Sequence, residues 1–265
     1  MAKIQIPRSL LRKLYVKEKS TAAEIARRLN CSEQTVRRRL AEYNITIRQR
    51  GPQPTARVSR QWSDKLAYVI GLVTADGNLS PDGRHITFVS ADLELHETYK
   101  QCLGISNKTG RHGSAFHTTF GDVVFYRWLL GIGLMPKKTF RVKKVDVPDK
   151  YFADFARGFL DGDGSITVYL DKYNVRKHQK KKYAYWRLYV RLHSGNRPLL
   201  EWMQDKIKEL LSIKGTIVAS GSIWAIQYAK RESLRFLSWV YYHRNAPCLE
   251  RKRAKYHDYL TKMDQ

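Results

Sequence analysis

One segment of this chain occurs twice, and the duplication constrains the fold more than any other feature. Residues 66–77 end in Thr-Ala-Asp-Gly and residues 153–164 end in Asp-Gly-Asp-Gly, with an apolar run and a glycine before each ending. After each copy the periodicity predicts a strand pair, a helix, a hairpin and a second helix. The sequence therefore predicts α+β units related by a pseudo-two-fold axis. The matched segments are strands 86–90 and 190–194, helices 92–102 and 197–211, hairpins 109–120 and 216–228, and helices 123–130 and 234–242.

The small residues inside the duplicated segment predict how the two copies meet. Gly71 and Ala75 lie one helical turn apart on the same face, as do Gly158 and Gly162. Small residues at that spacing let two helices approach closely, which brings together the aspartates at their C-terminal ends.

The two aspartates at those ends, Asp76 and Asp163, are the candidate metal ligands. Carboxylates held side by side repel each other unless a cation lies between them, and hard oxygen ligands suit Mg²⁺. We expect the metal site to include the neighbouring positions Ala75 and Gly162. A plain helix stop explains one Asp-Gly pair but not two matching ones. A calcium loop is excluded because it would need Gly and Glu at positions where the chain has Ile166 and Lys172.

The nonapeptides 69–77 and 156–164 resemble the motif of the LAGLIDADG homing endonucleases, and two copies are similar to a single-chain member. The resemblance covers about residues 62–260. It implies two αββαββα subdomains, 62–150 and 151–265, whose antiparallel sheets form a saddle on DNA. It also implies cleavage across the minor groove with Mg²⁺ or Mn²⁺, whereas Ca²⁺ would occupy the sites without supporting cleavage. A basic residue near each metal is implied at Lys138 and Lys252, with Lys137 and Arg251 as rivals.

The first 47 residues predict a separate small helical domain. Helices are expected over 9–17, 21–29 and 33–43, with Thr21 and Ser32 as N-caps and a break at Asn30. This pattern resembles a helix-turn-helix, although many such motifs have Gly where this chain has Asn30. The alternative is an ordinary helical module with a solvated basic face. In a helix-turn-helix the second helix reads the major groove, and its outward candidates here are Gln34, Thr35, Arg37 and Arg38.

Residues 48–61 contain Pro, Gly and Arg without periodicity and predict a semi-extended linker. Its arginines Arg48, Arg50 and Arg57 are candidates for lying along a DNA groove. The segment could equally be a plain tether.

The charge of the chain favours a polyanionic partner. The formal net charge is +25, whereas a soluble domain needs a magnitude of only about 2–8. It divides into +11 over residues 1–61, +3 over 62–150 and +11 over 151–265. No apolar run reaches the roughly 18 residues of a membrane span, no signal peptide is evident, and three separated cysteines imply no disulfide framework.

Alternating strands supply the expected DNA-reading surface of the two repeats. Over residues 187–193, apolar residues on one face alternate with basic and aromatic residues on the other. A basic insertion over 172–182 would continue along the DNA backbone. The predicted contacts are His85, Thr87, Lys172, Arg176, Lys180, Arg187, Tyr189, Arg191, His193 and Gln227.

The sequence thus predicts a monomeric, Mg²⁺-dependent endonuclease that makes a double-strand break in a long, near-palindromic DNA target and needs no protein partner. The alternatives are a transcriptional regulator that binds without cutting and an intron RNA maturase. We expect a cytoplasmic, nucleoid-associated protein if the source is prokaryotic, or an organellar one otherwise.

Overall fold

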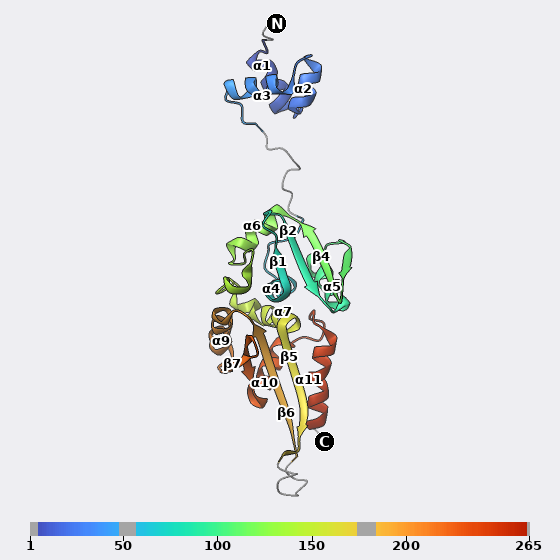
Figure 1. Ribbon diagram of the computed structural model, residues 1–265, viewed down its shortest axis with the longest axis vertical. Coiled ribbons are helices and arrows are strands. Elements are labelled where there is room, and N and C mark those ends of the chain that lie inside the picture. Colours follow the sequence, from blue (N-terminus) through green and yellow to red (C-terminus); the bar gives the residue numbers. More distant parts are fainter. Residues whose placement is uncertain (1–4, 48–56, 174–183, 264–265) are drawn as a thin grey trace. The chain divides into compact units, whose positions relative to one another are not determined.

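The computed structural model describes residues 5–47, 57–173 and 184–263 (Figure 1). The chain divides into two compact units, Met1–Gln53 and Pro54–Gln265, which are described separately. Among the described residues no helix is both long and apolar enough to cross a bilayer.

The first unit is a small helical domain around its own apolar core. Thr21 caps α2 through a complete capping box with Glu24, and Ser32 caps α3 by accepting from the Thr35 amide. Asn30, between these helices, adopts the left-handed conformation at φ 46°. The predicted first helix begins one residue earlier, at Arg8, and widens into a π-helix. The elements are α1 (Arg8–Leu11), the π-helix η1 (Arg12–Lys17), α2 (Ala22–Arg28) and α3 (Glu33–Glu42).

The second unit contains the two predicted α+β repeats. Its four-stranded antiparallel sheets have the matching strand orders β1-β2-β4-β3 and β5-β6-β8-β7. The first repeat comprises α4 (Asp64–Asp76), β1 (Gly77–Leu79), β2 (His85–Ser90), α5 (Leu93–Leu103), β3 (Thr109–His112), β4 (Ala115–Gly121), α6 (Val123–Gly131) and the 3₁₀ turn η2 (Lys138–Phe140). After the turn η3 (Asp149–Tyr151), the second comprises α7 (Phe152–Asp163), β5 (Gly164–Asp171), β6 (Tyr185–Ser194), α9 (Arg197–Leu211), β7 (Thr216–Ser220), β8 (Ile223–Tyr228), α10 (Lys230–Val240) and α11 (Glu250–Met263).

The helix that follows the last hairpin of the second repeat, α10, differs from its expected bounds. The helix predicted over 234–242 runs from Lys230 to Val240. Its start was hidden because only Ala229 separates β8 from three charged residues, without a turn residue. The buried Ser233 hydroxyl donates to the Tyr228 carbonyl and ties this first turn to the end of β8.

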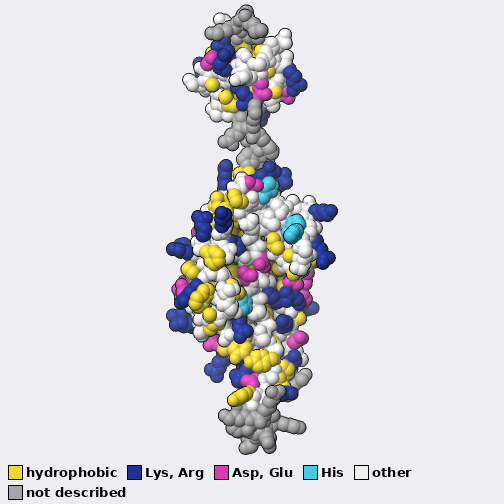
Figure 2. Space-filling view, viewed as in Figure 1, with side chains coloured by type: hydrophobic (Ala, Val, Ile, Leu, Met, Phe, Trp, Pro, Cys, Tyr) yellow, Lys and Arg dark blue, Asp and Glu magenta, His cyan; other side chains and the backbone are white. Residues whose placement is uncertain are grey.

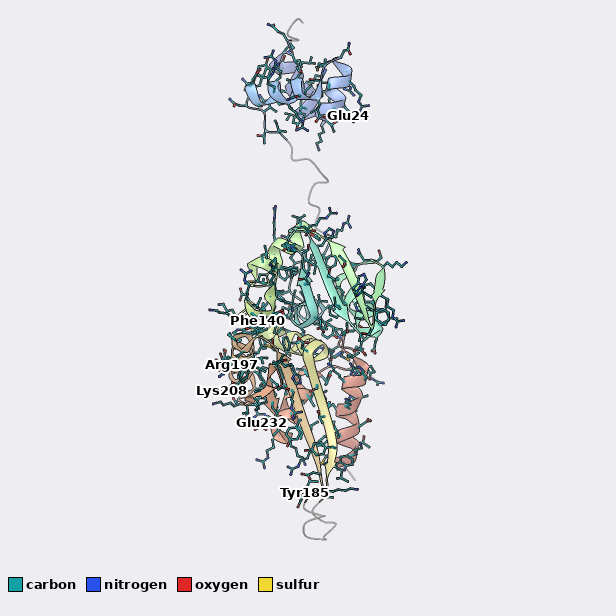
Figure 3. All side chains as sticks on the ribbon, in the orientation of Figure 1. Glu24, Phe140, Tyr185, Arg197, Lys208 and Glu232 are labelled. Carbon is teal, nitrogen blue, oxygen red and sulfur yellow. The ribbon has the colours of Figure 1, made fainter. Side chains whose placement is uncertain are left out.

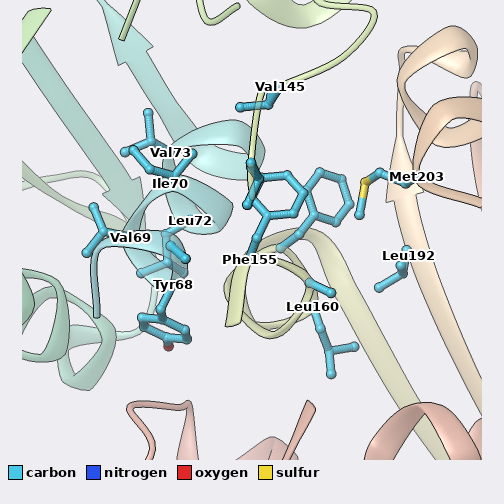
Figure 4. Close-up of a cluster of buried hydrophobic side chains, with 14 of the residues drawn as sticks. Tyr68, Val69, Ile70, Leu72, Val73, Val145, Phe155, Leu160, Leu192 and Met203 are labelled. Carbon is cyan, nitrogen blue, oxygen red and sulfur yellow. The ribbon is translucent and has the colours of Figure 1, made fainter. Parts of the chain in front are cut away.

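A single hydrophobic core joins the two repeats. Helices α4 and α7 lie side by side at its centre, and side chains from both line it (Figure 4). Tyr68 and Val69 on α4 and Phe155 on α7 have no exposed surface. Each sheet contributes its apolar face, so the opposite face of each remains free to present polar side chains.

Part of the predicted linker packs into the second unit. Asp122, which is 2% exposed, accepts from the amides of Arg57 and Val58 and also caps α6 at Phe125. Val58 is itself buried. The chain is therefore anchored to the second unit from residue 57 onward.

Candidate active site

The duplicated segments form the helices α4 and α7, and each ends at the aspartate of its motif. The next residues, Gly77 and Gly164, are extended and begin β1 and β5 directly. Asp76 and Asp163 thus occupy equivalent junctions between a central helix and the first strand of a sheet.

The glycines of the motif let the two central helices touch backbone to backbone. A Cβ atom at Gly71 would lie 2.1 Å from the Phe155 carbonyl oxygen, and one at Gly158 would lie 2.0 Å from that of Tyr68. One turn further on, a Cβ atom at Gly162 would lie 2.5 Å from the Ala75 Cβ and 3.2 Å from Asp76 Oδ2. Any side chain at these glycines would therefore separate the ends of the helices.

The close approach places Asp76 and Asp163 beside each other. Burial, and then the adjacent Asp163 carboxylate, raise the pKa of Asp76 to about 7. Burial likewise raises the pKa of Asp163, against the opposing effect of the two neighbouring lysines. Two acids held this close form a site that a cation would stabilise. The described residues hold no group of three or more Asp, Glu, His or Cys side chains that could bind a metal ion, so the carboxylate donors here are these two.

Lys138 and Lys252 point to equivalent places at the two helix ends. Lys138 Nζ donates to the Thr74 carbonyl at 2.6 Å and to the Ala75 carbonyl. Lys252 Nζ donates to the carbonyls of Leu160, Asp161 and Gly164 at 2.7–2.8 Å. Burial lowers the pKa of both, that of Lys252 to about 8.

The rival basic residues point elsewhere. Lys137 is exposed in a left-handed conformation. Arg251 forms a two-pronged ion pair with Asp92, its Nη2 lying 2.7 Å from Asp92 Oδ2. Of each adjacent pair, the geometry thus brings only Lys138 and Lys252 to the helix ends.

A buried charged network stands behind the second lysine and was not found from the sequence. Arg157, with no exposed surface, donates to Asp154 and to the carbonyls of Val240 and Pro247. Asp161, 2% exposed, accepts from the Tyr68 hydroxyl and the Leu249 amide. Their only sequence signal was two charges at otherwise apolar or small positions of the motif.

The outer face of the second sheet presents the predicted basic and aromatic side chains. Leu188, Val190 and Leu192 have no exposed surface, while the residues between them are partly exposed. β6 runs from Tyr185, at the outer end of the unit, toward its middle, where Phe140 lies (Figure 3). Arg187 donates to Asp171, and Arg191 donates to Gln227. His193 is hydrogen-bonded to the Ser165 hydroxyl. The Tyr189 ring stacks on Tyr169 and contacts the Arg191 guanidinium.

The equivalent face of the first sheet is less basic. His85 Nδ1 lies 2.5 Å from Asp82 Oδ2, and Thr87 Oγ1 lies 2.8 Å from Thr119 Oγ1. Strand register also places His117 of β4 on this face, opposite Val89. His117 and Thr119 were missed because β4 was predicted only as part of a hairpin.

In the first unit, the candidates for DNA contact lie along α3. Gln34 is exposed, whereas the Thr35 hydroxyl is hydrogen-bonded to that of Ser32. Arg37 pairs with Glu33 at 2.7 Å and Arg38 lies 3.7 Å from Glu42. Lys and Arg side chains are spread over the visible surface of both units rather than gathered in one tail (Figure 2).

Of the remaining predicted DNA contacts, two lie on the surface and four are not described by the structure. Arg57 and Lys172 are exposed. Arg48, Arg50, Arg176 and Lys180 lie outside the described residues.

Comparisons with known proteins agree with the LAGLIDADG resemblance of the chain. Residues 157–262 match the family model described as LAGLIDADG endonuclease. No curated protein matches the chain significantly by sequence. The I-LtrWI LAGLIDADG homing endonuclease bound to target DNA is similar in structure, with 11% identity, coverage of 76% of this chain and 90% of that chain, and a TM-score of 0.52.

Two further solved structures are similar. Meganuclease I-SmaMI bound to uncleavable DNA has 13% identity, with coverage of 78% of this chain and 90% of that chain and a TM-score of 0.51. Full-length DUF199/WhiA from Thermatoga maritima has 14% identity, with coverage of 76% and 62% and a TM-score of 0.46.

Proposed function

We propose that this chain, which has the LAGLIDADG fold and matches the family's endonuclease model in its second repeat, is a site-specific endonuclease that cuts both strands of a DNA duplex. The observation that carries the proposal is the pair Asp76 and Asp163 at touching helix ends, with one lysine beside each, Lys138 half-buried and Lys252 buried. A protein that only bound DNA would have no need for two neighbouring carboxylates whose charges repel.

The donor set fits a divalent metal. Asp76 and Asp163 supply hard carboxylate oxygens, and burial raises the pKa of both, so a bound cation would favour their charged forms. Mg²⁺ or Mn²⁺ bound there would activate water and stabilise the leaving oxygen of a phosphodiester. Ala75 was also predicted as part of the metal site, and its backbone carbonyl accepts from Lys138.

The lysines supply positive charge beside each carboxylate. Each ammonium is held by backbone carbonyls at a helix end, so it is fixed before DNA arrives. A preorganised cation can stabilise the charge that develops on a scissile phosphate or hold the attacking water. With one aspartate and one lysine for each repeat, a single chain has the groups to cut both strands and should act as a monomer.

The sheets and the first unit would provide the binding energy for DNA. The face of β6 carries Arg187, Tyr189, Arg191 and His193 in alternation, a pattern suited to the major groove. The matching sheet topologies suit a near-palindromic target because duplex DNA has its own two-fold axis. The first unit, as a helix-turn-helix module, would add contacts through α3.

Selection of cleaved fragments from a genomic DNA library with Mg²⁺ tests the proposal. We expect one enriched target that is cut on both strands by the wild-type chain. The variants Asp76→Asn and Asp163→Asn should lose double-strand cleavage, leaving at most a nick, yet retain binding. Selective binding of DNA without cutting under any divalent condition would indicate a regulator, and preferential binding of folded RNA would indicate a maturase.

A further inference from the structure

The two halves of the candidate active site differ in how their lysines are held. With Asp76 aligned to Asp163, Thr74 is equivalent to Asp161 and Tyr68 is equivalent to Phe155. The Thr74 hydroxyl donates to Ile70 of its own helix, and Phe155 has no hydroxyl to offer. Asp161, by contrast, accepts from Tyr68 of the other repeat at 2.9 Å.

The Asp161 carboxylate also holds the first turn of the helix that carries Lys252. Its Oδ2 accepts from the Leu249 amide at 2.7 Å. The Leu249 carbonyl in turn accepts from the amides of Lys252 and Arg253, so Leu249 caps α11. The side chain of Lys252 then returns to the Asp161 carbonyl at 2.8 Å.

This arrangement is closed and shielded from water. Asp161 and Lys252 are 2% and 5% exposed, and Tyr68 has no exposed surface. Among the described residues Lys138 has no counterpart to this support, since it lies in the three-residue turn η2 and its ammonium donates to two carbonyls of α4. The pseudo-two-fold symmetry is therefore broken at the groups that fix the lysines.

We propose that Asp161 is a positioning residue that holds Lys252 for cleavage of one DNA strand, while cleavage of the other strand, served by Lys138, does not depend on it. The inference rests on the proposed function. Each repeat faces one strand of the duplex because the pseudo-two-fold of the protein matches that of DNA. Displacement of Lys252 should therefore slow the cleavage of one strand selectively.

The test measures the two strands separately. A plasmid carrying the selected target, or a duplex labelled differently on each strand, gives both first-order rates for enzyme in excess. Lys252→Ala first identifies the strand that this lysine serves. Asp161→Thr, which installs the residue found at the equivalent position of the first repeat, should lower the cleavage rate of that strand on the order of tenfold or more. The cleavage rate of the other strand should change less than about twofold, so nicked DNA should accumulate.

Two further variants separate positioning from a loss of folding. Tyr68→Phe removes one hydrogen bond to Asp161 and should give a smaller bias toward the same nick. Asp122→Asn is the matched control: Asp122 is also 2% exposed and accepts backbone amides, but it serves α6 and residues 57 and 58. It should leave the ratio of the two rates unchanged.

The outcomes are distinct. Equal slowing of both strands by Asp161→Thr and by Tyr68→Phe, or a strand ratio no different from that of Asp122→Asn, would overturn the inference while leaving the proposed function intact. A wild-type chain that cuts neither strand would instead overturn the proposed function, and the inference with it. Circular dichroism and DNA binding in Ca²⁺ establish that each variant is folded.

Discussion

Removal of the buried guanidinium of Arg157 should cost the second unit a large part of its stability. Arg157 has no exposed surface and donates to Asp154 Oδ1 at 2.7 Å. It also donates to the Val240 and Pro247 carbonyls, each at 2.8 Å, and so holds the segment between α10 and α11 against α7. No water can replace these bonds without opening the core.

The magnitude follows from these three contacts. A hydrogen bond to a charged group contributes about 1.5–3 kcal/mol. Breaking a buried ion pair by removing one partner costs about 3–5 kcal/mol, since the other charge stays buried. For Arg157→Met we expect a loss of about 4 kcal/mol, at the middle of that range. With a urea dependence of about 2–3 kcal/mol per molar, the unfolding midpoint should fall by about 1.5 M.

Tryptophan fluorescence during urea unfolding measures this loss in the full-length chain. All six tryptophans lie in the second unit, so the signal excludes the first. The double variant Arg157→Met/Asp154→Leu is the control, because it removes both charges and should recover much of the loss. A loss below about 1 kcal/mol for Arg157→Met, or a double variant less stable than the single one, would refute the reasoning.

Three other predictions concern the site and the first unit. Lys138→Ala should slow cleavage of one strand at least tenfold by single-turnover kinetics, whereas the adjacent exposed Lys137→Ala should not; equal effects would contradict the assignment. Because the pKa of Asp76 is raised to about 7, the folded metal-free protein binds more protons than the unfolded chain from about pH 4 to pH 7. Its unfolding free energy should therefore fall as pH rises through this range, and urea titrations in EDTA should show a smaller fall for Asp76→Asn. Removal of residues 1–47 should weaken DNA binding and flatten its salt dependence without abolishing cleavage, and unchanged affinity at every salt concentration would rule out a DNA-binding role for this unit.

The glycine spacing was the part of the fold that the sequence specified best. Gly71 and Gly158 predicted a close helix contact, and the helices touch there. The helix over 197–211 was predicted with its observed bounds, and its start is marked by Asn196 as the cap and by Pro198 at N2. Each feature is indicated by a local pattern, namely the spacing of small residues within each copy and the cap and proline at the start of the helix, so local patterns were enough to find them.

Long-range partners could not be predicted in this way. Nothing in the sequence indicates that Arg157 donates to carbonyls of Val240 and Pro247, which lie 83 and 90 residues further on. The choice between Lys137 and Lys138 was equally hidden, because it depends on the left-handed conformation of Lys137 and on the turn that follows. The contacts of Arg157 and Lys138 could not be predicted because they are made with backbone carbonyls of distant segments.

The repeats share a topology but differ in the chemistry of the sheet faces that we propose to meet DNA. In the first sheet His85 is paired with Asp82, and Thr87 with Thr119. In the second sheet the outer face carries the arginines of β6. The formal net charge is likewise smaller for the first repeat, +3, than for the second, +11. Phosphate contacts dominate the affinity of DNA-binding proteins, so the half of the target that meets the second repeat should contribute more binding energy. Binding to the half-site that meets the second repeat should therefore fall more steeply with rising salt than binding to the other half-site, although both halves meet sheets of the same topology.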